Sequence, residues 1–294
     1  MWLKAYGNVS VVEEKVRIIL EALPGKPEHQ LGLWEERIHF GLKKALRETD
    51  GMRRIMDGIT SYDWDETLDI ALKYLPEDTR LDPVMVVTVD GYNGGMFKQD
   101  TIFLSLIYFD LSVVSLESFS HEFHHMGAEY WWTKDAVIQG LRSSEDPRKK
   151  YIVDLFTYTV KEGLANAFCS PQAITKGYGE LDELIHLYEE TSDQILIDLE
   201  VLMDKILSGN LEEISTSYYD FTMDQKGIGL PPGHFLSGSM VRTMDSSPAV
   251  SRAELISLVK EPFNFFKLYN RAVEKMQISQ DLLERVYALL GVSV

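Results

Sequence analysis

Residues 116–132 read LESFSHEFHHMGAEYWW, and this stretch gives the first indication of both fold and chemistry. Its apolar residues recur at helical spacing, so we expect a helix over these residues. Within it, His121-Glu-Phe-His-His125 matches the pattern His-Glu-x-x-His. Imidazoles four residues apart lie about 40° apart around a helix of 3.6 residues per turn. His121 and His125 can therefore both reach one zinc ion.

Two further side chains of this motif need a role. Glu122 lies about 100° from His121 and about 60° from His125 around the helix, so it can polarise a water molecule at the metal. His124 competes with His125 as the second ligand. Pairing His121 with His124, however, would place the metal on the opposite side of the helix from Glu122. We therefore assign His121 and His125 as ligands and Glu122 as the general base.

A catalytic zinc site has three protein ligands and one open position. The longer metzincin pattern requires glycine at position 128 and histidine at position 131, but this chain has Ala128 and Trp131, which excludes it. A carboxylate from a later helix is the next candidate, and Glu162 is the best placed. Asp154 and Glu129 remain the alternative ligands.

Glu162 lies in an expected helix over residues 147–170, whose other nearby residues are mostly apolar. Small residues at 163, 165 and 167 would let another helix approach closely. Asn166 follows one helical turn later on the face of Glu162, where its amide could accept the free N–H of a liganding imidazole. A purely structural role for Asn166 is an equal alternative.

With His121-Glu122-x-x-His125 followed on a later helix by Glu162-x-x-Ala165-Asn166, the chain resembles the gluzincin group of zinc metallopeptidases. It also resembles uncharacterised bacterial and archaeal proteins classed as zinc-dependent peptidases. The likeness covers about residues 84–170. It implies a zincin-like fold, one Zn²⁺ per chain and a peptide or protein substrate.

The resemblance also implies a histidine or tyrosine from the C-terminal helical lobe that stabilises the oxyanion. His234, in Pro231-Pro-Gly-His234, lies at an expected helix start, where the positive end of the helix dipole would add to the effect. Tyr218 and Tyr219 compete for this role.

The patterns around the motif predict an α+β fold that is mostly helical. A small β-sheet region precedes the metal-binding helix, and a helical C-terminal lobe follows it. No repeat or linker divides the chain, so we expect one zincin-like domain over residues 1–294, with a soft division between lobes 1–135 and 136–294. Strands are expected at 84–89 and 101–106, joined by a glycine-rich turn at 91–95, and helices at 10–23, 29–47 (ending near Asp50-Gly51), 65–74, 116–132, 147–170, 180–207, 251–260 and 278–290.

The charge of the chain limits its partners. Its 294 residues include 46 acidic and 29 basic side chains, a net charge of −17. Such a surface repels phosphate backbones and anionic lipid, so we expect no nucleic-acid or membrane partner. The single cysteine, Cys169, has no internal disulfide partner, and no apolar run approaches the roughly 20 residues that span a bilayer. We expect a soluble, cytoplasmic protein, whose oligomeric state stays open.

Two other functions are compatible with parts of the sequence. Glu-x-x-His occurs at residues 36–39, 122–125 and 183–186, and two such pairs with two further glutamates build a di-iron bundle. Charged neighbours around the first and third pairs indicate solvated faces instead. The other possibility is a non-catalytic helical interaction protein with a vestigial or structural metal site, which would have four protein ligands. Zinc-dependent peptide hydrolysis is our leading hypothesis.

Overall fold

The computed structural model describes residues 41–42, 44–62, 64–89, 95–98, 101–106, 113–171, 182–223 and 230–292. These residues are mostly helical, as predicted. They form two compact units: one contains the described residues up to 64 and within 82–122, and the other those within 65–81 and from 123 onwards. The boundary at 122–123 lies inside one helix, whereas the sequence suggested a softer division at 135–136.

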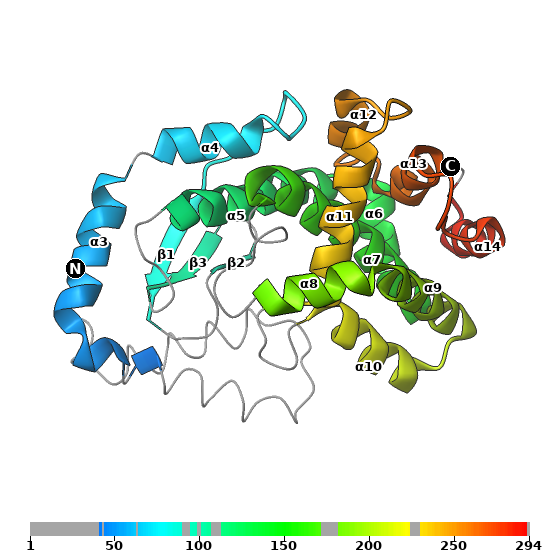
Figure 1. Ribbon diagram of the computed structural model, residues 1–294, viewed down its shortest axis with the longest axis horizontal. Helices are drawn as coiled ribbons and strands as arrows, with labels where there is room; N and C mark the ends of the chain where they lie inside the picture. The colour runs from blue at the N-terminus through cyan, green and yellow to red at the C-terminus, as the bar shows by residue number, and fades with distance from the viewer. Residues whose placement is uncertain are drawn as a thin grey trace. The chain divides into compact units, whose positions relative to one another are not determined.

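The first unit contains a helix, a small sheet and the start of the motif helix. Its elements are α3 (Thr49–Ser61), β1 (Val84–Thr88), β2 (Gly95–Lys98), β3 (Thr101–Ser105) and the first part of α5 (Val113–Trp132). The strand order is β1-β3-β2, with β1 parallel and β2 antiparallel to the central strand β3 (Figure 1). Strand β2 was not predicted, because its first residue, Gly95, was assigned to the glycine-rich turn and only three residues follow it in the strand.

The helix predicted at 29–47 is confirmed where the structure describes it, since residues 41–42 and 44–47 are helical, but the break expected near Asp50-Gly51 is not there. Helix α3 begins at Thr49 and continues through Gly51 to Ser61, with Met52 and Ile59 buried. The interruption lies earlier, at Glu48, whose backbone has φ −113° and ψ 34°. Glycine inside a helix costs about 1 kcal/mol, which a buried apolar face offsets. The helix predicted at 10–23 and the start of the one predicted at 29–47 lie outside the described residues, as does most of the turn at 91–95.

The second unit is built from helices around α7. Aspartates 135 and 146 cap α6 and α7 by accepting backbone N–H groups of their first turns. The predicted helix at 180–207 is divided at Thr191, whose hydroxyl donates to the carbonyl of Leu187. The elements are α4 (Trp64–Leu72), α6 (Ala136–Arg142), α7 (Pro147–Leu164), η3 (Ala165–Cys169), α8 (Asp182–Glu190), α9 (Ser192–Ser208), α10 (Leu211–Thr222), α11 (Pro232–Ser246), α12 (Arg252–Ser257), η6 (Pro262–Asn264), α13 (Phe265–Ala272) and α14 (Gln280–Leu290).

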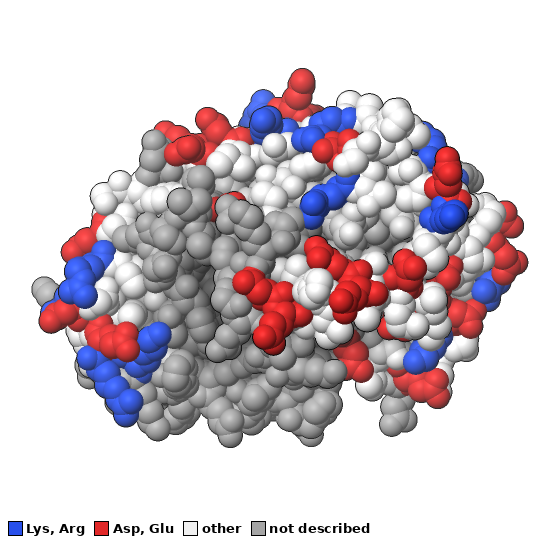
Figure 2. Space-filling view, in the orientation of Figure 1, with Lys and Arg blue, Asp and Glu red and all other residues white. Residues whose placement is uncertain are grey.

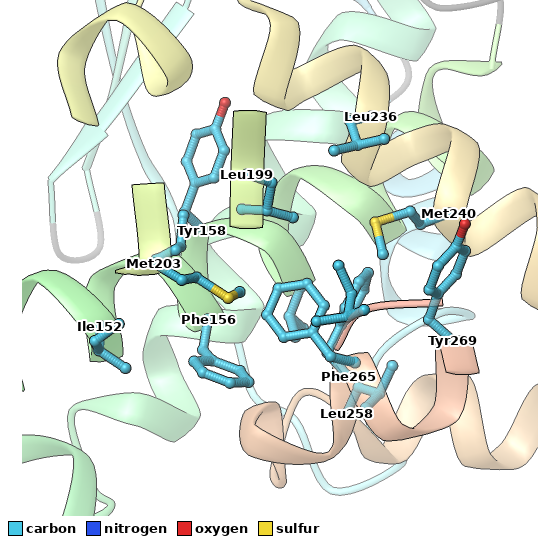
Figure 3. Packing of buried hydrophobic residues seen from close by; sticks show 14 of the residues in the cluster. Ile152, Phe156, Tyr158, Leu199, Met203, Leu236, Met240, Leu258, Phe265 and Tyr269 are labelled. Carbon is cyan, nitrogen blue, oxygen red and sulfur yellow. The ribbon is translucent and has the colours of Figure 1, made fainter. Parts of the chain in front are cut away.

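Helix α7 is the centre of the hydrophobic core of this unit. Ile152 and Phe156 of α7 are fully buried, and Met203 of α9 and Phe265 of α13 pack in the same cluster (Figure 3). Burying a side chain of this size stabilises the fold by about 1.5–3 kcal/mol. Helix α7 is therefore held on several sides and cannot shift independently of its neighbours.

Helix α11 approaches α7 closely at Gly163. A Cβ atom on Gly163 would lie 2.8 Å from Val241 Cγ2 and 2.9 Å from the carbonyl oxygen of Ser237. Only a residue without a side chain fits at this crossing. His234 lies one turn before Ser237 on the same face of α11, so the crossing also brings His234 towards α7.

The described surface carries many acidic side chains. On the face drawn in Figure 2, acidic side chains gather over helix α8. Glu189, Glu190, Asp193 and Asp198 are all exposed. Among the described helices, none combines the length and the apolar composition needed to cross a bilayer.

After α7 the chain leaves α-helical geometry. Residues 165–169 form a π-helical turn, η3, in which the N–H of Ser170 donates to the carbonyl of Ala165 at 2.9 Å. Such turns are rare and often lie beside functional sites. Here the turn begins three residues after Glu162.

Candidate metal centre

Helices α5 and α7 bring three potential ligands together. The ligand atoms of His121, His125 and Glu162 all lie within 4.8 Å of one another. His125 and Glu162 are each 4% exposed, whereas His121 and Glu122 are partly exposed. Burying a carboxylate costs free energy unless its charge is paired or bound to a metal ion. The buried imidazole of His125 and carboxylate of Glu162 therefore suit a metal site.

The donor set fits a zinc ion. Atoms bound to tetrahedral zinc at about 2.0–2.1 Å lie roughly 3.4 Å from one another. Nε2 of His125 lies 3.3 Å from Oε1 of Glu162, which agrees with that spacing. Two imidazoles and one carboxylate are a usual zinc ligand set. Within the described chain this group has three members, the number typical of a catalytic site.

His124 is not part of this group. It is fully buried, and its Nε2 lies 3.2 Å from the carbonyl oxygen of Tyr74. Because a carbonyl oxygen only accepts hydrogen bonds, Nε2 of His124 carries the proton and donates it. His124 therefore fixes the position of α5 against the segment that follows α4.

A lysine and a histidine approach the carboxylate of Glu162. Lys161 Nζ lies 3.5 Å from Oε1, the oxygen that also faces His125. His234 Nε2 lies 3.1 Å from Oε2. His234 stands in the first turn of α11, which follows the N-cap Pro231, so the positive end of the helix dipole also faces the carboxylate. These groups offset the cost of burying its negative charge.

Tyr158, which the sequence did not single out, contacts His234. Its hydroxyl oxygen lies 2.7 Å from Nδ1 of His234, and the two rings meet edge to face with centroids 5.4 Å apart. Burial, with a smaller effect from the negative charge of Glu162, raises the pKa of Tyr158 well above its ordinary value. The one available signal was its spacing: Tyr158 lies four residues before Glu162, on the same face of α7.

The alternative ligands and oxyanion groups lie in a different cluster. Arg142 binds both carboxylate oxygens of Glu129, at 2.6 and 3.3 Å, and its Nε lies 3.5 Å from Asp154. The rings of Tyr218 and Tyr219 pack against each other, and burial raises the pKa of Tyr218 well above its ordinary value. None of these four side chains belongs to the three-ligand group of the described chain.

Asn166 is buried within the π-helical turn η3. The hydroxyl oxygen of Ser170 lies 3.5 Å from its Oδ1. The expected contact with a liganding imidazole stays a prediction.

The other Glu-x-x-His pairs show no comparable setting in the described residues. On α8, His186 is 73% exposed and lies 3.8 Å from Glu189 and 3.4 Å from Glu190. This is a solvated helix face. Residues 36–39 lie outside the described residues.

Comparison with known families agrees with the donor set. A family model described as "Putative zinc dependent peptidase (DUF5700)" matches residues 17–277, which is most of the chain. Comparisons with curated proteins and with solved structures found no match. The predicted resemblance to zinc-dependent peptidases is confirmed at the level of this family, while the gluzincin assignment stays a prediction. The chain therefore belongs to the DUF5700 family of putative zinc dependent peptidases.

Proposed function

We propose that this protein hydrolyses peptide bonds, with one zinc ion held by His121, His125 and Glu162 and with Glu122 as the general base. The observation that carries the proposal is the 3.3 Å approach of two buried donors, His125 Nε2 and Glu162 Oε1, from separate helices. His121 completes the set one helical turn before His125. The family description supports the same metal and the same reaction class.

Zinc in such a site acts as a Lewis acid, which makes water acidic enough to lose a proton near neutral pH. Glu122 follows His121 directly on α5 and is more exposed than the buried ligands His125 and Glu162. Its carboxylate accepts one proton of the attacking water as the new C–O bond forms. It then passes that proton to the amine nitrogen as the C–N bond breaks. The substrate is a peptide or a segment of a protein.

Replacing Glu122 with glutamine separates metal binding from catalysis. We expect the variant to retain about one zinc per chain, because Glu122 is not a ligand. Loss of the base should lower kcat for a peptide substrate by about 10²–10⁴-fold. Glu129→Gln on the same helix is the matched control, expected to keep both zinc and activity. A Glu122→Gln protein with undiminished hydrolysis would remove Glu122 as the base.

The third ligand is tested by its zinc affinity. Glu162→Gln should lose zinc at chelator concentrations that the parent withstands, because the carboxylate charge and a ligand oxygen are both removed. Asp154→Asn, on the same helix, removes the charge of the alternative ligand and is expected to bind zinc as the parent does. The reverse pattern would transfer the assignment to Asp154.

A further inference from the structure

We propose that Tyr158 and His234 orient Glu162 as a metal ligand: Tyr158 contacts His234, and His234 contacts Glu162. Both are therefore positioning residues. The inference rests on the proposed metal centre and differs from the oxyanion role that the family resemblance implied for His234. All of the residues that carry it, including His125, lie in the second compact unit.

The two oxygens of Glu162 face different partners. Oε1 lies 3.3 Å from Nε2 of the ligand His125, while Oε2 lies 3.1 Å from Nε2 of His234. A carboxylate only accepts hydrogen bonds, so Nε2 of His234 carries the proton in this contact. This close contact restrains Oε2 and leaves Oε1 directed at the metal position. Partners of this kind fix the orientation of a liganding group and raise metal affinity.

Tyr158 holds the other end of the His234 ring. Its hydroxyl lies 2.7 Å from Nδ1, and because its pKa is raised by burial, the phenol keeps its proton. Because Nε2 faces a carboxylate and carries the ring proton, Nδ1 of the neutral ring is the acceptor for the phenol O–H. The Tyr158 hydroxyl and the Glu162 carboxylate are thus compatible with the same tautomer of His234.

The backbone holds Tyr158, His234 and Glu162 at these distances. Tyr158 and Glu162 lie one helical turn apart on α7, whose core side chains are fully buried. His234 comes from α11, which is pressed against α7 at Gly163. A ring that is hydrogen-bonded at Nδ1, contacts a buried carboxylate at Nε2 and stands on a helix packed tightly against α7 has little freedom to move towards a substrate.

The test measures zinc affinity, by competition with a chromophoric chelator at one fixed pH, and does not depend on activity. His234→Ala should weaken zinc binding by about 10–100-fold. His234→Gln should recover part of this loss, because its amide N–H can reach the place of Nε2. Tyr158→Phe should weaken binding less than His234→Ala, since it frees the ring without removing it.

Tyr287→Phe is the matched control. It removes the hydroxyl of another buried tyrosine, on α14, which donates to the carbonyl of Phe263 at 3.1 Å. The variant should bind zinc as the parent does. Thermal melts of the metal-free proteins show whether each variant is folded. A folded His234→Ala protein with parental zinc affinity and a reduced kcat would overturn the proposal and support the oxyanion role. A parent chain that binds no zinc would overturn both the metal centre and this inference.

Discussion

Replacing Gly163 with alanine tests how closely α11 must approach α7. The added Cβ would lie 2.8 Å from Val241 Cγ2 and 2.9 Å from the Ser237 carbonyl oxygen. The methyl group of Val241 can move a little, but the carbonyl oxygen belongs to the backbone of α11. The helix itself must therefore move outward by several tenths of an ångström.

The expected magnitude is a difference of two effects. Alanine stabilises a helix interior by about 1 kcal/mol relative to glycine. Overpacking a close contact costs about 1–3 kcal/mol, and the backbone contact at Ser237 places Gly163→Ala at the upper end of that range. The net loss should be about 1–2 kcal/mol, which lowers the melting temperature by roughly 2–8 °C.

Thermal denaturation of the metal-free protein is the assay, and Gly140→Ala is its control. Gly140 is also helical, in α6, but a Cβ there would meet no atom within 4 Å. This control should be stabilised by about 0.5–1 kcal/mol, through helix propensity alone. A Gly163→Ala protein that melts as high as Gly140→Ala would refute the close crossing. Zinc affinity should fall in Gly163→Ala only, since the outward shift of α11 carries His234 away from Glu162.

Three further outcomes are expected. Trp132→Phe removes the 2.8 Å hydrogen bond from Nε1 to the Val259 carbonyl and leaves that buried oxygen without it, so urea denaturation should show a loss of about 1–3 kcal/mol; an unchanged midpoint would contradict this. Hydrogen bonds from the Ser251 backbone and Arg271 lower the pKa of Glu254 from 4.5 to about 2. Because the pKa of Glu254 is lower in the folded state, its stabilisation is present above pH 4.5 and is lost as the pH falls towards 2. The difference in unfolding free energy between the parent and Glu254→Gln should therefore shrink over that interval. A constant difference would contradict this. Zinc at one hundred times its Kd should raise the unfolding free energy of the stripped protein by about 2.7 kcal/mol, and a melting temperature insensitive to zinc would argue against the metal centre.

The three proposed ligands could be predicted because their pattern is local. The spacing of His121 and His125 is fixed by helix geometry alone, and Glu162 could be chosen because a carboxylate is unusual among its apolar neighbours. The structure brings these three side chains together. Tyr158 could not be found in the same way, because its partner His234 reaches it only through the crossing of α11 over α7. The sequence of α7 alone does not indicate which helix packs against it.

The fold shows the same limit. Helix α14 was predicted over 278–290 and observed at Gln280–Leu290, because its apolar face is regular and its Ser279 cap is explicit. Helix α10 was not predicted, since its sequence LEEISTSYYDFT is rich in residues with weak helix propensity. Buried Ile214 and Phe221 pack it into the core, and such tertiary contacts override local propensity.

The π-helical turn of residues 165–169 has a consequence for how the chain tolerates insertions and deletions. An i→i+5 hydrogen bond spans one residue more than the i→i+4 bond of an α-helix. The η3 turn is therefore equivalent to a one-residue insertion that the helix accommodates without forming a loop. Deleting one residue there would leave Glu162 in phase with α7. It would, however, turn everything downstream by about 100°, including Phe168, which stacks on the ring of Tyr74 at 4.7 Å. The turn therefore sets the rotation between the proposed ligand Glu162 and the ring of Phe168 that stacks on Tyr74.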